Sequence, residues 1–407
     1  MCNRDQKVYV GWGKRLSTAL CLLTISFCII YPAFAGAAGS EAPVEEKGEA
    51  VPKKKYRLST KSGGRLLPIP LFLTEPAIGY GLGAALGYIH PTKDDSETQE
   101  EPSLHTLGSV TAERSGQKPP PTITGIAGGY TSKDTWAVAV GHAASWRKDL
   151  IRYAGGLAYA DVKSTYYPLD RSIDFNLKGF GLYQDLKFRL GKSRFFLGGK
   201  LLWLETESQF DITIGEDTEL GIENIHSSNV GVAAAVTYDG RDNVFTPNSG
   251  QLLQFDIWRF DEGLGGDYNY WRGDLKLLSF YPMHPRFVLG LRVAVSTVDG
   301  SAPFYAYPWV SMRGISAMRY QGKSAGTVEV EGRWNISPRW GIVGFAGAGA
   351  VHSREISGFK IAKDDIFAGG AGVRYFLMRD LGLWLGIDVA RGPEDWYGYI
   401  TVGHAWR

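Results

Sequence analysis

The sequence is poor in cysteine. Of its 407 residues only Cys2, Cys21 and Cys28 are cysteines, and all three precede residue 30. The rest of the chain can therefore form no disulfide staple and no thiolate metal site. Metal-ligand clusters and phosphate-binding glycine loops are not evident either, so the sequence predicts neither a metal nor a cofactor.

Long apolar runs and a charge excess are also missing. Beyond residue 35 no segment is apolar for the length that a membrane-spanning helix needs, and the formal net charge is only +2, which gives no indication of nucleic-acid binding. Glycine, in contrast, is abundant at 52 residues, and few segments have helical periodicity. This composition favours one large all-β unit over two or three soluble domains.

The N-terminus is typical of an exported protein. Lys14 and Arg15 precede an apolar run, and Ala33-Phe34-Ala35 offers small residues at a cleavage site, so residues 1–35 are predicted to be a cleaved signal peptide. The alternative is an uncleaved membrane anchor, since the run is about long enough to span a bilayer. Residues 36–65 are small, polar and charged, as in a periplasmic linker. The main domain would then span residues 66–407.

From residue 76 onward the chain alternates between apolar and polar residues, in segments bounded by Gly, Pro, Asp or Asn. Fifteen such segments can be counted: 78–90, 122–131, 135–146, 151–161, 173–190, 195–210, 230–239, 251–260, 270–281, 287–298, 327–336, 341–351, 366–377, 381–389 and 397–406. A barrel with both ends on one side of a membrane needs an even number of strands. We therefore predict about sixteen strands, with the missing one within 56–73 or 105–112.

The length of these segments and their aromatic ends favour a transmembrane antiparallel β-barrel with lipid outside and a polar lumen. A soluble sandwich would give the same alternation. However, many segments exceed the usual strand length, and aromatics such as Trp146, Trp340 and Trp396 gather near their ends, as in interfacial girdles. Closure would also remove the exposed edges of so large a sheet. The predicted location is the outer membrane of a Gram-negative cell.

The connections between these segments are of two kinds. Several are tight, whereas four are long, at 91–121, 211–229, 300–324 and 352–364. In outer-membrane barrels short turns face the periplasm and long loops face outward. Within the third long connection, Tyr305–Gly322 is too aromatic for a solvated loop, and we expect it to fold into the lumen and carry Arg313 with it.

Four motifs resemble those of one family and follow one another along the chain in the same order as in that family. Met312-Arg313-Gly314-Ile315 resembles the Arg-Gly-aromatic lumen-loop motif of the BamA/TamA-type outer-membrane protein assembly factors, the bacterial surface antigen superfamily. Gly370–Arg374 resembles its Gly-x-Gly-x-Arg strand, Asp239–Gly250 its strand-turn-strand signature, and Thr401–Trp406 its closing strand. The resemblance covers roughly Leu66–Arg407, without the globular periplasmic domains that the family's assembly factors carry.

The resemblance implies a role in the insertion or translocation of proteins, or in lipid handling, at the outer membrane. The implied partners are membrane lipids (phospholipid and lipopolysaccharide), unfolded outer-membrane clients, a periplasmic partner protein and, for a homo-oligomer, a second copy of the chain. A passive channel or a structural surface protein is the alternative.

Arg313 is the first candidate functional residue, because a guanidinium inside a lumen needs a carboxylate partner. The family's Phe-x-Asp-x-Gly acid is missing here, where the sequence reads Phe345-Ala-Gly-Ala-Gly349. The candidate partners are the inward-facing Glu329 and Glu331, with Asp388 behind them. An ordinary loop arginine is the alternative reading.

Three further groups of residues were weighed. Gly370 and Gly372 share a face with Arg374, where a docked loop could lie close to the wall, although barrel curvature alone also explains glycines. Gly403 and Trp406 resemble the closing-strand signal of an outer-membrane client, or form a simple last strand. A lipid hydrolase would need a Ser-His-acid arrangement; His142 with Ser145 and His352 with Ser353 are the nearest sequence pairs. No enzymatic activity is predicted.

Overall fold

The computed structural model describes residues 64–91, 120–166, 173–214, 218–244, 246–352, 365–378 and 383–406. The predicted signal peptide and nearly all of the predicted linker lie outside these residues. Within them, no helix is long and apolar enough to cross a membrane.

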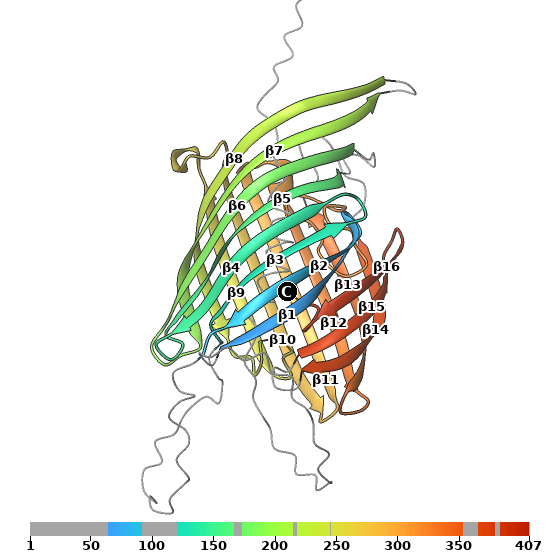
Figure 1. Cartoon of the computed structure of the whole chain (residues 1–407). Helices are drawn as coiled ribbons and strands as arrows, with labels where there is room; N and C mark the ends of the chain where they lie inside the picture. The colour runs from blue at the N-terminus through green and yellow to red at the C-terminus, as the bar shows by residue number, and fades with distance from the viewer. Residues whose placement is uncertain are drawn as a thin grey trace, which may run out of the picture.

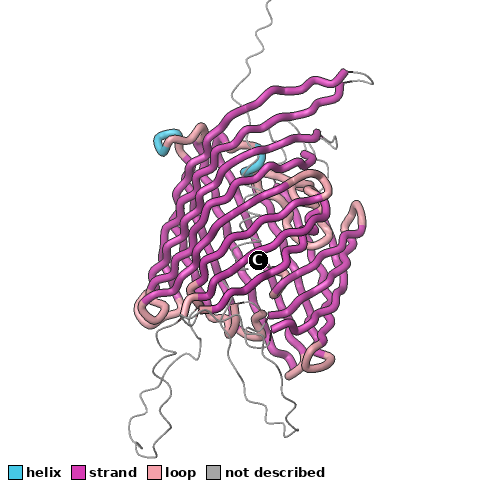
Figure 2. Tube along the Cα trace, viewed as in Figure 1, coloured by secondary structure: helices cyan, strands magenta, loops and turns pink. Residues whose placement is uncertain are grey.

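The described residues form one antiparallel sheet of sixteen strands in sequential order, curled into a barrel (Figure 1). Figure 2 shows that loops and two short 3-10 turns, η3 (Glu262–Leu264) and η4 (Phe304–Ala306), make up the rest. The strands are β1 (Arg65–Glu75), β2 (Gly79–Ile89), β3 (Ile123–Thr131), β4 (Trp136–Trp146), β5 (Ile151–Tyr166), β6 (Ile173–Arg189), β7 (Phe195–Ile214), β8 (Thr218–Asp239), β9 (Gly250–Phe260), β10 (Asn269–His284), β11 (Phe287–Ser301), β12 (Ser324–Asn335), β13 (Trp340–His352), β14 (Ile366–Met378), β15 (Leu383–Arg391) and β16 (Trp396–Val402).

The all-β barrel and its sixteen strands are as predicted from the alternation. The strand that the count of fifteen lacked is β1, which overlaps the first of the two segments considered for it. The other segment, 105–112, lies outside the described residues.

The two faces of the wall are reversed relative to a soluble barrel. On β12 the charged row is buried, with Glu329 at 4% and Glu331 at 8% exposure, whereas Val328 and Val330 are 45% and 44% exposed. The same holds on β15, where Asp388 is fully buried between the exposed Ile387 and Val389. An apolar outer surface and a polar interior are the arrangement that lipid requires.

One long connection was predicted wrongly. Residues 211–214 and 218–229 form strand instead of a loop, because β7 and β8 pair with each other up to Ile214↔Thr218. In Figure 1 this hairpin projects beyond the neighbouring strands. The polar residues of the segment suggested a loop, yet apolar residues still alternate with them, as at Ile212, Ile214, Leu220 and Ile222.

The orientation of a second long connection was also predicted wrongly. All consecutive strands are antiparallel, so connections alternate between the two ends of the barrel. The connection from β2 to β3 therefore joins the wall at the end of the tight turns β4–β5 and β10–β11, and not at the end of the β11–β12 loop. Its composition suggested an outward loop, but strand parity fixes its end.

The reversed faces predict how added charge affects stability. We expect Val330→Arg, in the middle of β12 on the outer face, to reduce the free energy of unfolding by about 2–4 kcal/mol, because the guanidinium would lie in hydrocarbon. The matched control is Gln254→Arg, which adds the same charge on the lumen side of β9, and its effect should be much smaller. Urea titration in phospholipid vesicles, followed by tryptophan fluorescence, measures both; equal losses would contradict the assignment of faces.

Candidate functional site: the lumen loop and its docking cluster

The connection between β11 and β12 folds into the barrel interior. Tyr305 and Val310 are fully buried. The two arms of the loop pair with each other, since Val310 N donates to Tyr320 O at 3.0 Å and Gly322 N donates to Pro308 O at 3.0 Å. The amide of Gln321 closes the base by donating to the carbonyl oxygens of Phe304 and Tyr307. The loop is therefore an ordered hairpin inside the lumen.

The aromatic base of the loop packs against the wall on one side. The Phe304 ring lies 6.0 Å from that of Phe175 on β6 and 5.6 Å from that of Phe210 on β7, measured between centroids. The hydroxyl of Tyr305 accepts a hydrogen bond of 2.8 Å from Asn229 Nδ2 on β8. These contacts anchor the start of the loop on β6–β8.

Arg313, at the tip of the loop, is held on the opposite wall by two carboxylates. Its Nη1 donates to Asp388 Oδ2 on β15 at 2.9 Å, and its Nη2 donates to Glu331 Oε2 on β12 at 2.7 Å. The guanidinium carbon also lies 3.5 Å from the centroid of the Phe345 ring on β13. One buried cation thus binds three strands.

A second guanidinium completes this cluster. Arg374 on β14 forms a bidentate pair with Asp388, with Nη2 at 3.0 Å from Oδ2, and lies 4.0 Å from Glu331. Two cations therefore share two carboxylates, which compensates each buried charge. Burial alone would lower the pKa of Arg313, but Glu331 and Asp388 outweigh it and raise that pKa, so the cation stays charged.

The structure distributes the predicted carboxylates unequally. Glu331 and Asp388 bind Arg313, whereas Glu329 pairs with Arg292 on β11. Arg292 also donates to the backbone oxygen of Ser311 in the loop at 2.7 Å. Glu329 therefore acts on the loop through Arg292, its cross-strand neighbour on β11.

The predicted glycines Gly370 and Gly372 make room for the cluster instead of for the loop backbone. A Cβ at Gly372 would overlap the Asp388 carboxylate, and a Cβ at Gly370 would lie 2.7 Å from the Phe345 ring. The loop itself packs on β13, where a Cβ at Gly347 would lie 3.0 Å from Met312 Sδ, and one at Gly349 would lie 3.2 Å from Val310 Cβ. The Gly-Ala-Gly sequence that lacks the family's acid thus provides the groove for the loop.

The loop backbone reaches both strands at the ends of the sheet. Gly314 has φ of +91°, which favours glycine, and its N–H donates to the Tyr399 hydroxyl of β16 at 2.9 Å. Ala317 N donates to Glu75 Oε1 of β1 at 2.9 Å. A Cβ at Gly392, in the β15–β16 turn, would overlap the Gly314 oxygen. Sequence reasoning missed Glu75, Tyr399 and Gly392, for which neither pattern nor motif gave a signal.

The closing segment departs from the predicted strand 397–406. β16 ends at Val402, and Gly403 follows with φ of +86°. Trp406 then lies inside the barrel, 4% exposed, where it packs with Phe280 of β10 and Val288 of β11. A Cβ at Gly290 would lie 2.6 Å from its ring. The left-handed turn at Gly403 directs the last residues inward, so Trp406 is not an interfacial strand residue.

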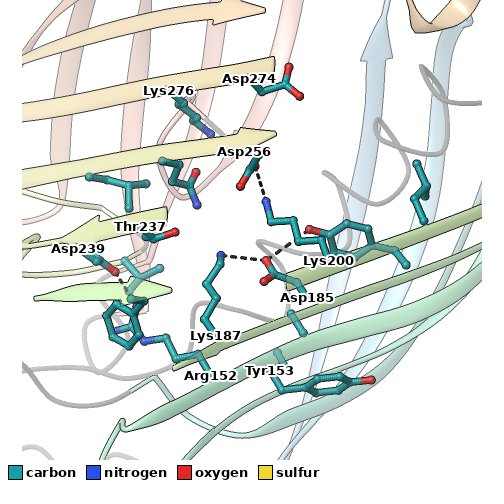
Figure 3. Close-up of a pocket in the computed structure, with 18 of the residues that line it drawn as sticks. Arg152, Tyr153, Asp185, Lys187, Lys200, Thr237, Asp239, Asp256, Asp274 and Lys276 are labelled. Atoms are coloured by element: carbon teal, nitrogen blue, oxygen red, sulfur yellow. Dashed lines mark hydrogen bonds and ion pairs between the residues drawn. The ribbon is translucent and has the colours of Figure 1, made fainter. Parts of the chain in front are cut away.

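The other side of the lumen contains a cavity of about 470 Å³, shown in Figure 3. Charged side chains project into it from β5 to β10. They pair with each other: Lys187 with Asp185 at 2.9 Å, Lys200 with Asp256, and Arg272 with Asp274 at 2.9 Å. At the tight-turn end Asp239 binds Arg152 at 2.9 Å and Arg241 at 3.0 Å, a structural ion network. The described residues contain no cluster of three metal-ligating side chains.

A comparison with protein families matches residues 204–374 to the Omp85 superfamily domain. This segment includes the loop, Glu331 and Arg374. The barrel therefore contains an Omp85 superfamily domain, which spans β8 to β13 and parts of β7 and β14. Among curated proteins no sequence matches it.

Solved structures of outer-membrane barrels have a similar fold. The chain is similar to BamA from Haemophilus ducreyi lacking POTRA domains 1-3, with a TM-score of 0.54 at 11% identity over 84% of this chain and 70% of that chain. It is similar to CdiB from Acinetobacter baumannii (TM-score 0.54, 11% identity, 83% and 59% covered) and from Escherichia coli (0.55, 11%, 84% and 62%). At such identity the likeness concerns the fold, and the chain spans less than two thirds of either CdiB chain.

Of the two sequence pairs considered for a hydrolase, His142 with Ser145 is not assembled in the barrel. His142 faces outward, in line with the exposed Val140, whereas Ser145 Oγ donates to Asp149 Oδ1 at 2.8 Å on the lumen side. Successive strand residues face opposite sides, which separates the two by geometry. Ser353 lies outside the described residues.

The contacts of Arg313 in the docking cluster predict that its replacement greatly reduces the free energy of unfolding. We expect Arg313→Ala to cost about 3–5 kcal/mol of unfolding free energy, because it leaves buried carboxylates uncompensated, and to expose the loop to trypsin at Arg319. Arg313→Lys should restore little, because lysine lacks the fork that binds two carboxylates. The measurements are urea titration in vesicles and limited trypsin digestion.

The matched control for this prediction is Arg391→Ala, which removes an exposed arginine 3.7 Å from Asp395. It should leave both readouts near those of the unmodified protein, as is usual for surface ion pairs. Resistance of the Arg313→Ala loop to trypsin would show that other contacts suffice to dock it.

Proposed function

We propose that this Omp85 barrel assists the insertion or translocation of proteins at the outer membrane, by opening the seam between β1 and β16. One observation carries the proposal. β1 and β16 are neighbours, yet no β-ladder joins them in the described part of the chain, whereas all fifteen consecutive strand pairs are hydrogen-bonded. The barrel thus has one weak contact in its wall.

The sequence of β1 is compatible with such a seam. Pro68 and Pro70 lie in this strand, and proline, which has no N–H to donate, is confined in sheets to edge strands, first positions and bulges. Two donors are therefore missing from β1, which limits its pairing with β16. The remaining backbone groups of an opened edge can pair with an incoming strand of a client.

The docked loop bridges this seam from the inside. It binds Tyr399 of β16 through Gly314 and Glu75 of β1 through Ala317, while Arg313 fixes it to β12 and β15. Loop docking and seam geometry are therefore coupled through named hydrogen bonds. A client strand that enters the seam would compete with these contacts.

The second candidate function is a passive channel, which the charged cavity of about 470 Å³ favours. Against it, the hairpin loop occupies one side of the lumen, and the Trp406 side chain lies among the residues that line the cavity. A large, steady single-channel conductance in planar bilayers would support the channel and would contradict a docked loop.

The first test is an insertion assay. A urea-unfolded outer-membrane barrel is diluted into liposomes with or without the purified protein, and its folding rate is measured. We expect acceleration by the unmodified protein and its loss in Arg313→Ala, because the undocked loop no longer organises the seam. Arg391→Ala is the control and should keep the acceleration. No acceleration by the unmodified protein would contradict an autonomous insertase.

A second arm locks the seam itself. Because the natural cysteines lie only at positions 2, 21 and 28, a cysteine placed on β1 and another on β16, at positions within disulfide range, form a defined cross-link. The oxidised protein should lose the acceleration and regain it on reduction. Full activity with the seam locked would refute the proposed mechanism.

A further inference from the structure

A row of polar side chains crosses the lipid-facing wall from β2 to β6. His90 Nε2 lies 2.9 Å from Thr124 Oγ1, and the same oxygen lies 2.7 Å from His142 Nδ1. The row continues to Tyr153, whose ring lies 6.0 Å from that of His142, and the Tyr153 hydroxyl donates to Gln184 Oε1. The five residues lie on five successive strands or their ends.

These side chains face outward. Thr124 alternates with the buried Ile123 and Gly125 and shares its face with the 59% exposed Ile126. Likewise His142 follows the 44% exposed Val140 at the spacing of one face. The wall on this face is otherwise apolar, so unpaired polar atoms in the row would be costly in hydrocarbon.

The height of the row on the barrel places it near an interface. His90 directly follows the last residue of β2, Thr124 is the second residue of β3, and His142 lies four residues before the end of β4 at Trp146. The Trp146 ring stacks on Tyr153 at 5.9 Å, as in an aromatic girdle. This end of the barrel is that of the tight turns, which face the periplasm in such barrels.

Thr124 fixes how the two imidazoles present their hydrogens. Its hydroxyl has one hydrogen and so donates to at most one imidazole, while its oxygen accepts an N–H from the other. The imidazole that accepts must carry its own N–H on its second ring nitrogen, Nδ1 of His90 or Nε2 of His142. With Thr124 as donor to one imidazole, the row offers one imidazole N–H next to the donor amide group of Gln184.

Space and charge beside the row suit an anion. Gly155 pairs with both His142 and Gln184, and because it has no side chain, the Tyr153 hydroxyl and the Gln184 amide oxygen meet above its backbone. Arg147 and Lys148, in the adjacent β4–β5 turn, are exposed. Hydrogen-bond donors and two nearby cations at an interface match the phosphate of a lipid whose acyl chains extend along the apolar wall.

We propose that the row His90, Thr124, His142, Tyr153 and Gln184 is a binding site for the phosphate of a phospholipid in the periplasmic leaflet. The site holds one lipid against β2–β6, with the phosphate at the imidazole and amide donors. This inference rests on the outer-membrane barrel and is independent of the insertion activity proposed above.

The test uses the detergent-purified, delipidated protein, incubated with phosphatidylglycerol and examined by native mass spectrometry. The variant combines His90→Phe, Thr124→Val and His142→Phe, which are apolar replacements on a lipid-facing wall and so should not impair folding. We expect one retained lipid in the unmodified protein and an occupancy about tenfold lower in the variant, since hydrogen bonds to a charged group are lost. Heat-modifiable migration in gels confirms that each barrel is folded.

Matched controls define the outcome. Tyr130→Phe removes the hydroxyl of a lipid-facing tyrosine at the other end of β3 and should leave occupancy unchanged. Diacylglycerol, which has the same chains without phosphate, should not be retained, and inorganic phosphate should not displace the lipid at millimolar concentration. Equal occupancy in the triple variant, or equal retention of diacylglycerol, would overturn the proposal. If inorganic phosphate binds as well as the lipid, the site is one for free phosphate and not for a headgroup.

Discussion

The structure depends on a buried arginine that must find negative charge inside a membrane protein. Arg313 has no solvent to stabilise it, so its place is where two carboxylates and an aromatic face converge. Those groups come from β12, β13 and β15, and the glycines of β13 and β14 leave space around them. The position of the loop follows from this requirement. The Arg313 guanidinium reaches both carboxylates when the loop backbone lies in the β13 groove.

From this anchor the consequences extend to the seam. The segment after Arg313 contacts β16 through Gly314 and β1 through Ala317, so the loop in the lumen also connects the two strands that have no ladder between them. Opposite the loop, the charges of β5–β10 pair with each other across a cavity instead of packing densely. The docked loop thus lies beside the seam, and the paired charges lie on the other side of the lumen.

Much of this arrangement could be predicted from the sequence. The alternation of apolar and polar residues along each strand predicts the reversed faces. The aromatic composition of Tyr305–Gly322 predicts that this loop folds inward. The choice between Glu329 and Glu331 could not be made, because both lie on one face of β12 and only the register with β11 assigns Glu329 to Arg292. The partners Glu75 and Tyr399 are separated from the loop by 242 and 85 residues, and no local pattern reports such contacts.

Two errors have local causes. The hairpin at residues 211–229 is polar but still alternates, so composition outweighed periodicity. Trp406 leaves the strand because of one positive φ at Gly403, and a glycine can adopt either sign of φ without a signal in its neighbours. Counting strands would have shown at which end of the barrel the β2–β3 connection joins the wall. The composition of this connection instead favoured the outward end.

The most direct test of the docked loop is a disulfide between Val310→Cys and Gly349→Cys. The Cβ of Val310 lies 3.2 Å from the position that a Cβ at Gly349 would occupy, close to the range that a disulfide spans. With the loop in the lumen, the pair should oxidise almost completely in native outer membranes, as judged by failure to react with maleimide before reduction. If both thiols stay free and react with maleimide, the loop does not occupy the β13 groove, and the account of the site fails.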